Sequence, residues 1–269
     1  MKTNNTTAGV NTAAISFDSF NLDKRVAAGI PNEYKTPTSI QVQAIPVVLE
    51  GKDVLGLAQT GTGKTAAFVL PILNRLVQER VEEASTNRNH NHNRGHVLRT
   101  LILAPTRELV EQICESIRVF GAKTGLRCTA IYGGVSMNQQ VQRLRQGVDI
   151  VVACPGRLLD HMQQRPIDLR RIEVLVLDEA DQMFDMGFLP SIHRILKALP
   201  VNRQTLMFSA TMPADVRHLA NDVLKNPVTI QVGSRTPVST VSHAVYVVEP
   251  ARKSSLLLHI LKETGPGSV

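Results

Sequence analysis

The sequence predicts an α/β fold in which a mostly parallel sheet is covered by helices on both faces. Apolar, β-branched segments alternate with helical patterns along most of the chain, which is typical of repeated strand–helix units. Several segments are nearly unbroken aliphatic runs, such as 101–103 and 174–177, as expected for parallel strands buried on both faces. The expected strands are residues 53–57, 99–104, 127–132, 148–153, 172–177, 204–208 and 228–232.

Length and composition are those of an ordinary globular protein and exclude several other classes. The chain has 269 residues, 43% of them hydrophobic, and no stretch reaches the ~18 consecutive apolar residues of a membrane span. The amino terminus lacks the apolar core of a signal peptide, so we expect a cytoplasmic protein without a membrane partner. Cys114, Cys128 and Cys154 are odd in number and form no C-x-x-C pair, which favours reduced thiols over disulfides or a zinc site.

The charge balance favours a polyanionic partner. The net charge is +7, tryptophan is absent, and aromatic residues make up only 4% of the chain. A protein that binds single strands by stacking bases on aromatic rings is therefore disfavoured. Any bound nucleic acid should be held mainly by its backbone.

The first part of the chain leads into the sheet. Residues 1–14 are polar and rich in Thr and Asn, so we expect a disordered leader, and residues 15–20 open the ordered region. A short helix is expected over 22–30. Residues 34–41 should form a turn-rich lead-in, because a proline and its polar neighbours oppose a helix until Ile40.

A glycine-rich segment after the first strand predicts a nucleotide-phosphate cradle. It reads Ala58-Gln59-Thr60-Gly61-Thr62-Gly63-Lys64-Thr65 and precedes an apolar helix expected to start at Ala66. Backbone N–H groups at a helix N-terminus bind polyphosphate well, and glycines allow the close approach. Lys64 would reach the β- and γ-phosphates, and the Thr65 hydroxyl would be a ligand of Mg²⁺. Ala58 departs from the plain G-x-x-x-x-G-K-[ST] pattern, but the strand-to-helix setting favours a cradle over a simple turn.

An asparagine-rich segment, residues 82–96, separates that helix from the second strand. Its polarity predicts a mobile surface insertion. The segment contains His90, His92 and His96, which could in principle bind a metal. A solvated loop without a fourth ligand favours no metal site.

Two carboxylates stand just past the end of a buried strand. The strand expected over 172–177 ends in Asp178-Glu179-Ala180-Asp181, at the sheet edge where α/β proteins bind ligands. Phosphoryl transfer to water needs one carboxylate to hold Mg²⁺ and another to orient or deprotonate the nucleophile. Asp178 suits the first role and Glu179 the second. An acidic cluster alone would fit a solvated turn. The phosphate cradle in the same chain favours a catalytic role instead.

Residues 178–181 spell D-E-A-D, and the chain here resembles the N-terminal RecA-like domain of a DEAD-box RNA helicase. The matching motifs occur in the family's order, and Ala at the first cradle position is a usual family form. They are Tyr34-Lys35-Thr36-Pro37-Thr38-Ser39-Ile40-Gln41 (similar to the Q motif), the cradle, Pro105-Thr106-Arg107-Glu108-Leu109, Gly133-Gly134, Pro155-Gly156-Arg157, D-E-A-D and Ser209-Ala210-Thr211. The resemblance implies a RecA-like P-loop fold, ATP and Mg²⁺ as cofactors, and RNA as partner.

The resemblance also implies a role for each group of residues. The nucleotide-binding set would be Phe17, Tyr34, Gln41, Thr60, Gly61, Thr62, Gly63, Lys64 and Thr65. Gln41 would recognise adenine and Phe17 would stack on it, although Phe20 is a close rival and either could be a core residue. The catalytic set would be Lys64, Asp178 and Glu179, with Thr65 and Asp178 on Mg²⁺. The RNA-facing set would be Thr106, Arg107, Gly134, Pro155, Gly156 and Arg157, and the coupling set Asp181, Ser209 and Thr211.

Three positions depart from the family pattern. Ser39 stands where the family usually has Pro, Glu33 where it usually has Gly, and Cys154 where Thr commonly precedes Pro-Gly-Arg. The first two loosen the turn before Gln41 without removing a contacting side chain. Cys154 could weaken one RNA contact, because a thiol is a poorer hydrogen-bond donor than a hydroxyl.

The resemblance implies a second RecA-like domain that is only begun here. We expect residues 15–232 to form the ATP-binding domain, 233–240 a linker, and 241–269 the start of a truncated second domain, with a strand over 243–248 and a helix over 254–261. We therefore expect this chain by itself to have weak or no ATPase and helicase activity.

Three functions are considered for the whole protein. The first is an ATP-dependent RNA helicase that couples hydrolysis to local unwinding. The second is an ATP-gated RNA clamp that remodels ribonucleoproteins with little unwinding. The third is an ATPase that acts on DNA or on no nucleic acid.

Overall fold

The computed structural model describes residues 15–86, 96–164, 167–232 and 244–263. The chain divides into two units, residues 1–233 and 234–269. The predicted leader, 1–14, and the predicted linker, 233–240, lie outside the described residues. Among the described residues, no helix has both the length and the apolar character needed to cross a membrane.

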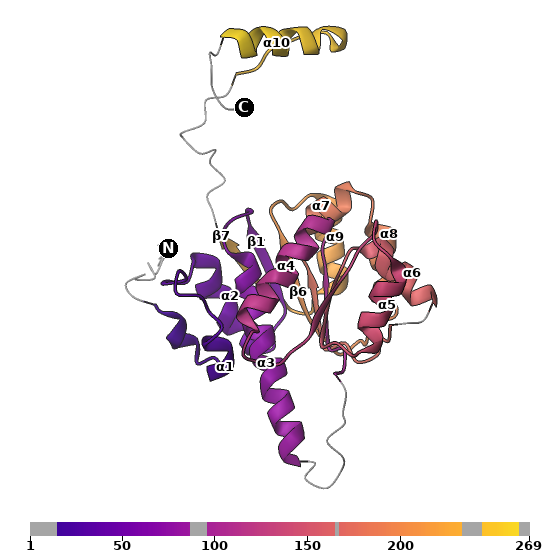
Figure 1. Cartoon of the computed structure of the whole chain (residues 1–269). Coiled ribbons are helices and arrows are strands. Elements are labelled where there is room, and N and C mark those ends of the chain that lie inside the picture. The colour runs from indigo at the N-terminus through magenta and orange to yellow at the C-terminus, as the bar shows by residue number, and fades with distance from the viewer. Residues whose placement is uncertain (1–14, 87–95, 165–166, 233–243, 264–269) are drawn as a thin grey trace, which may run out of the picture. The chain divides into compact units, whose positions relative to one another are not determined.

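The first unit is built on a seven-stranded parallel sheet with the strand order β3-β4-β2-β5-β6-β1-β7 (Figure 1). The strands are β1 (Val54–Ala58), β2 (Thr100–Leu103), β3 (Cys128–Ile131), β4 (Ile150–Ala153), β5 (Val174–Leu177), β6 (Gln204–Ser209) and β7 (Val228–Val232). Each lies where the sequence predicts a strand, so the α/β fold class is confirmed.

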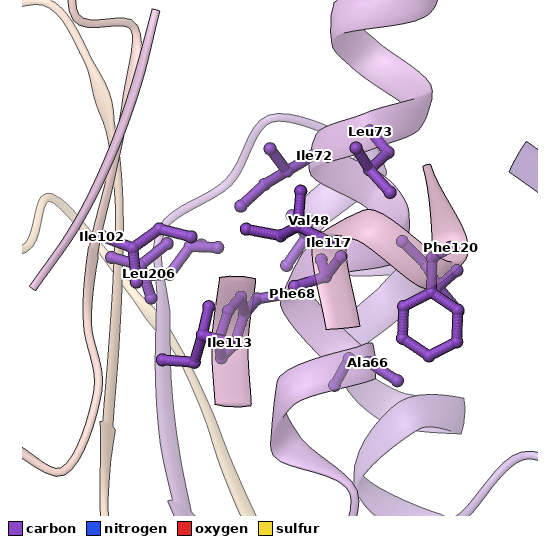
Figure 2. Packing of buried hydrophobic residues seen from close by; sticks show 14 of the residues in the cluster. Val48, Ala66, Phe68, Ile72, Leu73, Ile102, Ile113, Ile117, Phe120 and Leu206 are labelled. Carbon is purple, nitrogen blue, oxygen red and sulfur yellow. The ribbon is translucent and has the colours of Figure 1, made fainter. Parts of the chain in front are cut away.

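Helices connect the strands and cover both faces of the sheet. They are α1 (Lys24–Ala27), α2 (Ser39–Leu49), α3 (Lys64–Thr86), α4 (Arg107–Phe120), α5 (Met137–Arg145), α6 (Pro155–Gln164), α7 (Ala180–Asp185), α8 (Leu189–Leu196) and α9 (Ala214–Val223), after a 3₁₀ turn, η1 (Phe17–Phe20). One apolar cluster joins α2, α3 and α4 to the sheet, and a second joins α6, α7, α8 and α9 to it. Figure 2 shows Phe68 of α3 and Ile113 of α4 in the first cluster, beside Ile102 and Leu206 of the strands.

The two clusters explain the unbroken aliphatic runs of the sequence. Along β5, Val174 and Val176 pack into the first cluster, whereas Leu175 and Leu177 pack into the second. Successive side chains of a strand point to opposite faces, so every position of a strand between two helical layers must be apolar.

The helix predicted over 22–30 is shorter than expected. Helix α1 covers only Lys24–Ala27, with Asp23 as its N-cap, accepting a hydrogen bond from the N–H of Arg25. The chain then packs its backbone against α4, since a Cβ on Gly29 would lie 2.1 Å from the carbonyl oxygen of Phe120. This close approach leaves no room for another helical turn with side chains.

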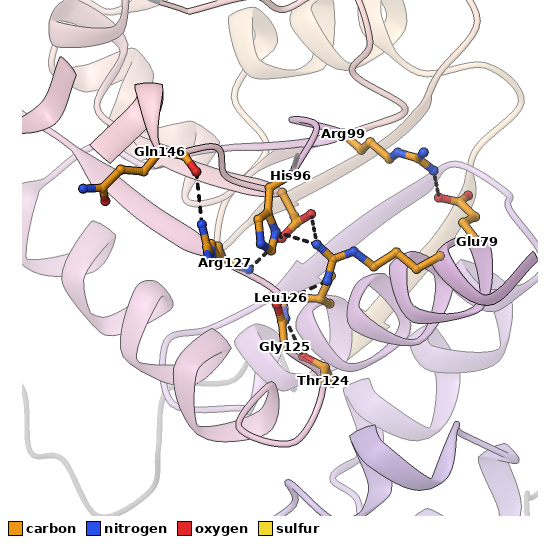
Figure 3. A network of polar contacts seen from close by, with 10 residues as sticks. Glu79, His96, Arg99, Thr124, Gly125, Leu126, Arg127 and Gln146 are labelled. Carbon is orange, nitrogen blue, oxygen red and sulfur yellow. Dashed lines mark hydrogen bonds and ion pairs between the residues drawn. The ribbon is translucent and has the colours of Figure 1, made fainter. Parts of the chain in front are cut away.

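The predicted insertion over 82–96 is too long at both ends. Helix α3 continues through Thr86, because Glu and Ala are good helix formers even where no apolar face requires burial. At the other end, His96 Nδ1 lies 2.6 Å from Oδ2 of Asp149, whose other oxygen accepts from Arg80 at 3.1 Å. Figure 3 shows His96 within this polar network, which ties the end of α3 to the sheet.

Of the three histidines of that segment, the structure describes only His96. His90 and His92 lie outside the described residues, and His96 is engaged with Asp149. No three His, Cys, Asp or Glu side chains gather as metal ligands within the described ranges.

The second unit contains a 3₁₀ turn, η2 (Pro250–Arg252), and α10 (Lys253–Glu263). The helix agrees with the one predicted over 254–261. The strand predicted over 243–248 is wrong: His243 lies outside the described residues, and 244–249 have no regular secondary structure. A strand needs a neighbour to pair its backbone groups, and the described part of this unit holds none.

Candidate active site

The carboxyl edge of the sheet gathers most of the predicted site residues. All seven strands are parallel, so their carboxyl ends meet at one edge, where open α/β sheets bind ligands. The motifs that follow these ends are represented by Lys64 after β1, Arg107 after β2, Gly134 after β3, Pro155 after β4, Asp178 after β5 and Ser209 at the end of β6. The fold thus brings together motifs that are far apart in the sequence.

The phosphate cradle has a backbone that only glycine adopts easily. Gly61 and Gly63 have φ angles of +83° and +90°, in the left-handed region. A Cβ on Gly63 would lie 2.6 Å from Nε2 of Gln41, so a larger residue would also displace that side chain. Helix α3 begins at Lys64, two residues before the predicted start, which places Lys64 and Thr65 in its first turn. Lys64 is buried, and its Nζ donates to the carbonyl oxygen of Ala58 at 2.9 Å.

Gln41 joins helix α2 to the cradle. Its Oε1 accepts from the N–H of Thr38 at 2.9 Å, and its Nε2 donates to the carbonyl oxygen of Gly63 at 3.1 Å. The side chain is buried and caps α2 as part of a capping box. Its contacts within the chain therefore position the cradle, and adenine recognition by Gln41 stays a prediction.

We expect Gln41→Ala to weaken binding of ATP and GTP about tenfold and also to narrow the preference for ATP. The change removes the hydrogen bond from Gln41 to Gly63 of the cradle and the one from Thr38 that holds the Gln41 side chain in place, and a lost buried hydrogen bond costs about 1–3 kcal/mol. Calorimetric titration with non-hydrolysable ATP and GTP analogues measures both effects. Gln43→Ala is the matched control, since among the described residues the Gln43 side chain bonds only to Ser39, within α2. An unchanged preference for ATP would remove Gln41 from base recognition.

The aromatic residues proposed for adenine form a cluster. Phe17 is 8% exposed and packs edge-on against Phe20, with ring centres 6.0 Å apart, and against Tyr34 at 6.5 Å. Tyr34 is 41% exposed and its ring also contacts Phe120 at 5.5 Å. Tyr34 therefore offers more free aromatic surface than Phe17, and stacking by Phe17 stays a prediction.

The acidic turn after β5 holds a buried carboxylate. Burial raises the pKa of Asp178 to about 6, and the positive charge of Lys64 opposes this rise. A buried carboxylate fits a divalent cation, and Thr65, the residue after Lys64 in the cradle, would supply a hydroxyl. The residues present thus fit Mg²⁺.

Glu179 has a strained backbone at the same turn. Its φ of +52° is uncommon for a residue with a side chain, and its N–H donates to Oδ1 of Asp178 at 3.1 Å. Glu179 is the N-cap of α7, but its side chain makes no capping hydrogen bond. Such strain is concentrated at functional sites, where the surrounding structure maintains it.

The three predicted coupling residues contact one another directly. Oδ2 of Asp181 accepts from the N–H of Thr211 at 2.8 Å and from its hydroxyl at 2.9 Å. Burial acts to raise the pKa of Asp181, but these hydrogen bonds hold it below its usual value. The Ser209 hydroxyl accepts from the N–H of Asp181 at 3.2 Å and donates to the carbonyl of Thr211 at 2.7 Å. Because β6 lies between β5 and β1, this cluster links the acidic turn to the strand that carries the cradle.

The predicted RNA-facing residues form a neighbouring group. Thr106 is the N-cap of α4, with its hydroxyl accepting from the N–H of Leu109 at 3.2 Å. Exposed Arg107 lies over the ring of Tyr132, 5.2 Å from its centre. Arg157 Nη1 donates to the carbonyl oxygen of Val135 at 3.0 Å. The remaining members are Gly134, which is exposed with a φ of +81°, and Pro155 and Gly156, which begin α6.

The side chain of Cys154 contacts the backbone of a neighbouring motif. Its Sγ lies 3.9 Å from the carbonyl oxygen of Pro105. Burial, together with the charge of Glu108, raises the pKa of this thiol to about 11. The thiol therefore stays protonated at neutral pH and is a weak nucleophile.

Several contacts at this edge had no signal in the sequence. Tyr132 lies under Arg107, and its hydroxyl donates to Glu111. Away from this edge, Cys114 of α4 and Cys128 at the start of β3 have their sulfur atoms 3.5 Å apart, and both are free thiols. Residues of no shared motif meet here because α4 packs on β3, which only the tertiary structure decides.

Strand order divides the edge into two adjacent groups. The motifs predicted to face RNA follow β3, β4 and β2, and the cradle, the acidic turn and the predicted coupling cluster follow β1, β5 and β6. Strands β2 and β5 are hydrogen-bonded neighbours, so the two groups meet where the acidic turn begins.

Comparison with known proteins gives consistent matches. The chain is 42% identical over 238 residues to DEAD-box ATP-dependent RNA helicase 42 of Arabidopsis thaliana, covering 87% of this chain and 19% of that protein. It is 40% identical over 258 residues to ATP-dependent RNA helicase DBP3 of Debaryomyces hansenii, covering 94% of this chain and 46% of that protein. The chain therefore spans less than half of the length of these curated relatives.

The fold has a solved counterpart, and a family model covers most of the first unit. The crystal structure of a hypothetical ATP-dependent RNA helicase from Sulfolobus tokodaii matches with a TM-score of 0.68 and 35% identity, over 78% of this chain and 57% of that one. The predicted RecA-like fold is thereby confirmed. The model of the DEAD/DEAH box helicase family matches residues 38–219. The chain therefore belongs to the DEAD/DEAH box helicase family.

Proposed function

We propose that the first unit binds ATP with Mg²⁺ and couples its hydrolysis to RNA binding and local duplex unwinding in an RNA helicase. The observation that carries this proposal is the strand order, because the motifs proposed to bind phosphate and those proposed to bind RNA follow neighbouring strands at one sheet edge. Residues of the two groups can then influence one another through the hydrogen-bonded strands β2 and β5.

The cradle and the acidic turn divide the work of ATP hydrolysis. The N–H groups of residues 61–65 bind the phosphates at the start of α3, and Lys64 adds a positive charge. Thr65 and Asp178 would hold Mg²⁺, which neutralises phosphate charge when bound. Glu179 orients the attacking water and accepts its proton.

The RNA-facing residues hold the sugar–phosphate backbone. Arg107 and Arg157 supply positive charge, and the starts of α4 and α6 supply N–H groups. Such contacts position a strand without reading its sequence, which agrees with the shortage of aromatic residues.

The coupling cluster transmits the state of the nucleotide site. Asp181 follows the acidic turn directly, and its bonds to Thr211 fix the loop after β6. A shift of the acidic turn on hydrolysis would move that loop. We infer that the second RecA-like domain of the family is the partner that receives this motion.

A strand-displacement assay tests the proposal. A short fluorescent RNA duplex is mixed with ATP, Mg²⁺ and this chain, alone or with a second RecA-like domain in trans. We expect displacement only in the mixture and only with ATP. ATP-dependent retention of RNA without displacement would favour the clamp, and equal stimulation of hydrolysis by DNA would favour an ATPase that is not specific for RNA.

A further inference from the structure

Two buried polar side chains lie beneath the RNA-facing loops and have no role in the function proposed above. His161 of α6 is 0% exposed, and its Nε2 lies 2.9 Å from Oε1 of Gln140 on α5, which is 3% exposed. Nε2 of Gln140 donates to the carbonyl oxygen of Tyr132 at 2.9 Å. A continuous chain of hydrogen bonds therefore runs from α6 through α5 to the end of β3.

The direction of this relay is fixed by its chemistry. The amide nitrogen of Gln140 donates to Tyr132, so its Oε1 is the acceptor and His161 must carry a proton on Nε2. Burial, with the charge of Arg157, lowers the pKa of His161, which keeps the ring neutral at physiological pH. Its Nδ1 has no hydrogen-bond partner among the described residues, which agrees with an unprotonated nitrogen.

The relay ends at the base of a loop that carries predicted RNA contacts. Tyr132 is followed by Gly133 and the exposed, left-handed Gly134. The Tyr132 ring also lies under Arg107, 5.2 Å from the guanidinium carbon. A displacement of Tyr132 would therefore move both the glycine loop and the arginine above its ring.

A second anchor on α6 holds the other side of the same loop. Arg157 donates to the carbonyl oxygen of Val135, and His161 lies four residues later, on the same face of the helix. Segment 132–140 is thus held to one face of α6 at two points, through the partly exposed Arg157 and the buried His161.

We propose that His161 and Gln140 are positioning residues for RNA binding. They hold the loop 133–135 in a fixed position relative to Arg107 and Arg157. This inference rests on the proposed RNA role of that loop and the two arginines. Neither His161 nor Gln140 touches RNA. They act by fixing the backbone of the residues that do.

Substitutions at both ends of the relay test the inference, with RNA affinity measured by the anisotropy of a short fluorescein-labelled oligouridylate at low salt. We expect His161→Leu and Gln140→Leu each to weaken RNA binding about fivefold, because a broken buried hydrogen bond frees the loop. His161→Gln keeps a neutral N–H donor of similar reach and should restore the affinity. Binding of an ATP analogue should be unchanged in all three variants, since the cradle lies after β1.

Gln204→Leu is the control for a purely structural effect. Gln204 is also buried, and its Nε2 donates to the carbonyl oxygens of Val48 and Lys52, at the opposite edge of the sheet. It should lower the melting temperature as the relay variants do and leave RNA affinity unchanged. Equal RNA affinities for His161→Leu, Gln140→Leu and Gln204→Leu, each measured well below its melting temperature, would overturn the inference.

Arg157→Ala separates this inference from the proposed function. Weaker RNA binding by Arg157→Ala together with unchanged binding by the relay variants would overturn the positioning role alone. Unchanged RNA binding by Arg157→Ala and Arg107→Ala would overturn the proposed RNA face, and the positioning role would fall with it.

Discussion

Replacing Glu179 by glutamine is expected to slow ATP hydrolysis about 10²- to 10⁴-fold while ATP affinity stays unchanged. The amide keeps the size of the carboxylate and loses its ability to accept a proton. The fold should tolerate the change, because the N–H of Glu179 bonds to Asp178 through the backbone and the side chain makes no capping hydrogen bond. Single-turnover hydrolysis, with protein in excess over radiolabelled ATP and a second RecA-like domain supplied in trans, measures the rate even when turnover is slow.

The matched control is Asp185→Asn, an exposed carboxylate at the end of the same short helix. It removes one negative charge from α7 without touching the turn after β5, so its hydrolysis rate should equal that of the unaltered chain. Loss of ATP binding in Glu179→Gln would instead assign Glu179 a structural role in the acidic turn.

Replacing Lys64 by alanine is expected to weaken ATP binding by about a hundredfold. Lys64 is the only side-chain cation of the cradle, residues 58–65, and it is held in place by burial and by the carbonyl oxygen of Ala58. A positive charge that is already desolvated and oriented contributes more to phosphate binding than an exposed lysine. Titration calorimetry with a non-hydrolysable ATP analogue and Mg²⁺ measures the loss.

Lys52→Ala is the charge-matched control for this substitution. Lys52 precedes β1, is exposed and pairs with Glu50, so its removal changes the net charge by the same amount at the opposite end of the strand. ATP affinity should be unaffected by Lys52→Ala. If Lys64→Ala also bound ATP normally, the cradle would not be the phosphate site.

The seven strands could be predicted because each is short and rich in apolar or β-branched residues. β5 illustrates the point: its four residues are all buried, since alternate side chains enter opposite apolar layers. The phosphate cradle could be predicted as well. Its left-handed backbone requires Gly61 and Gly63 and its ligand requires the charge of Lys64, so the site is visible as a motif of a few consecutive residues. The predicted helix boundaries differ from the observed ones, because α3 already starts at Lys64 and α1 ends before Gly29.

Contacts between distant segments could not be predicted in the same way. His96 belongs to an asparagine-rich segment whose composition indicates a loop, yet it packs beside Asp149. Its partner, Asp149, lies just before β4 and is far from His96 in the sequence, so no local sequence pattern includes both residues. The prediction of a strand over 243–248 was wrong for a related reason. A strand forms only beside a partner strand, and the local sequence does not specify that partner.

The sequence by itself determined the strand and helix segments, the phosphate cradle and the identity of the motif residues, because these depend on side-chain period and chemistry over a few residues. Only the tertiary structure decided that β5 lies between β2 and β6, that Gln41 reaches Gly63, and that a buried histidine supports the loop after β3. Those arrangements depend on how the two apolar layers pack across the sheet, and packing is settled by residues far apart in the chain.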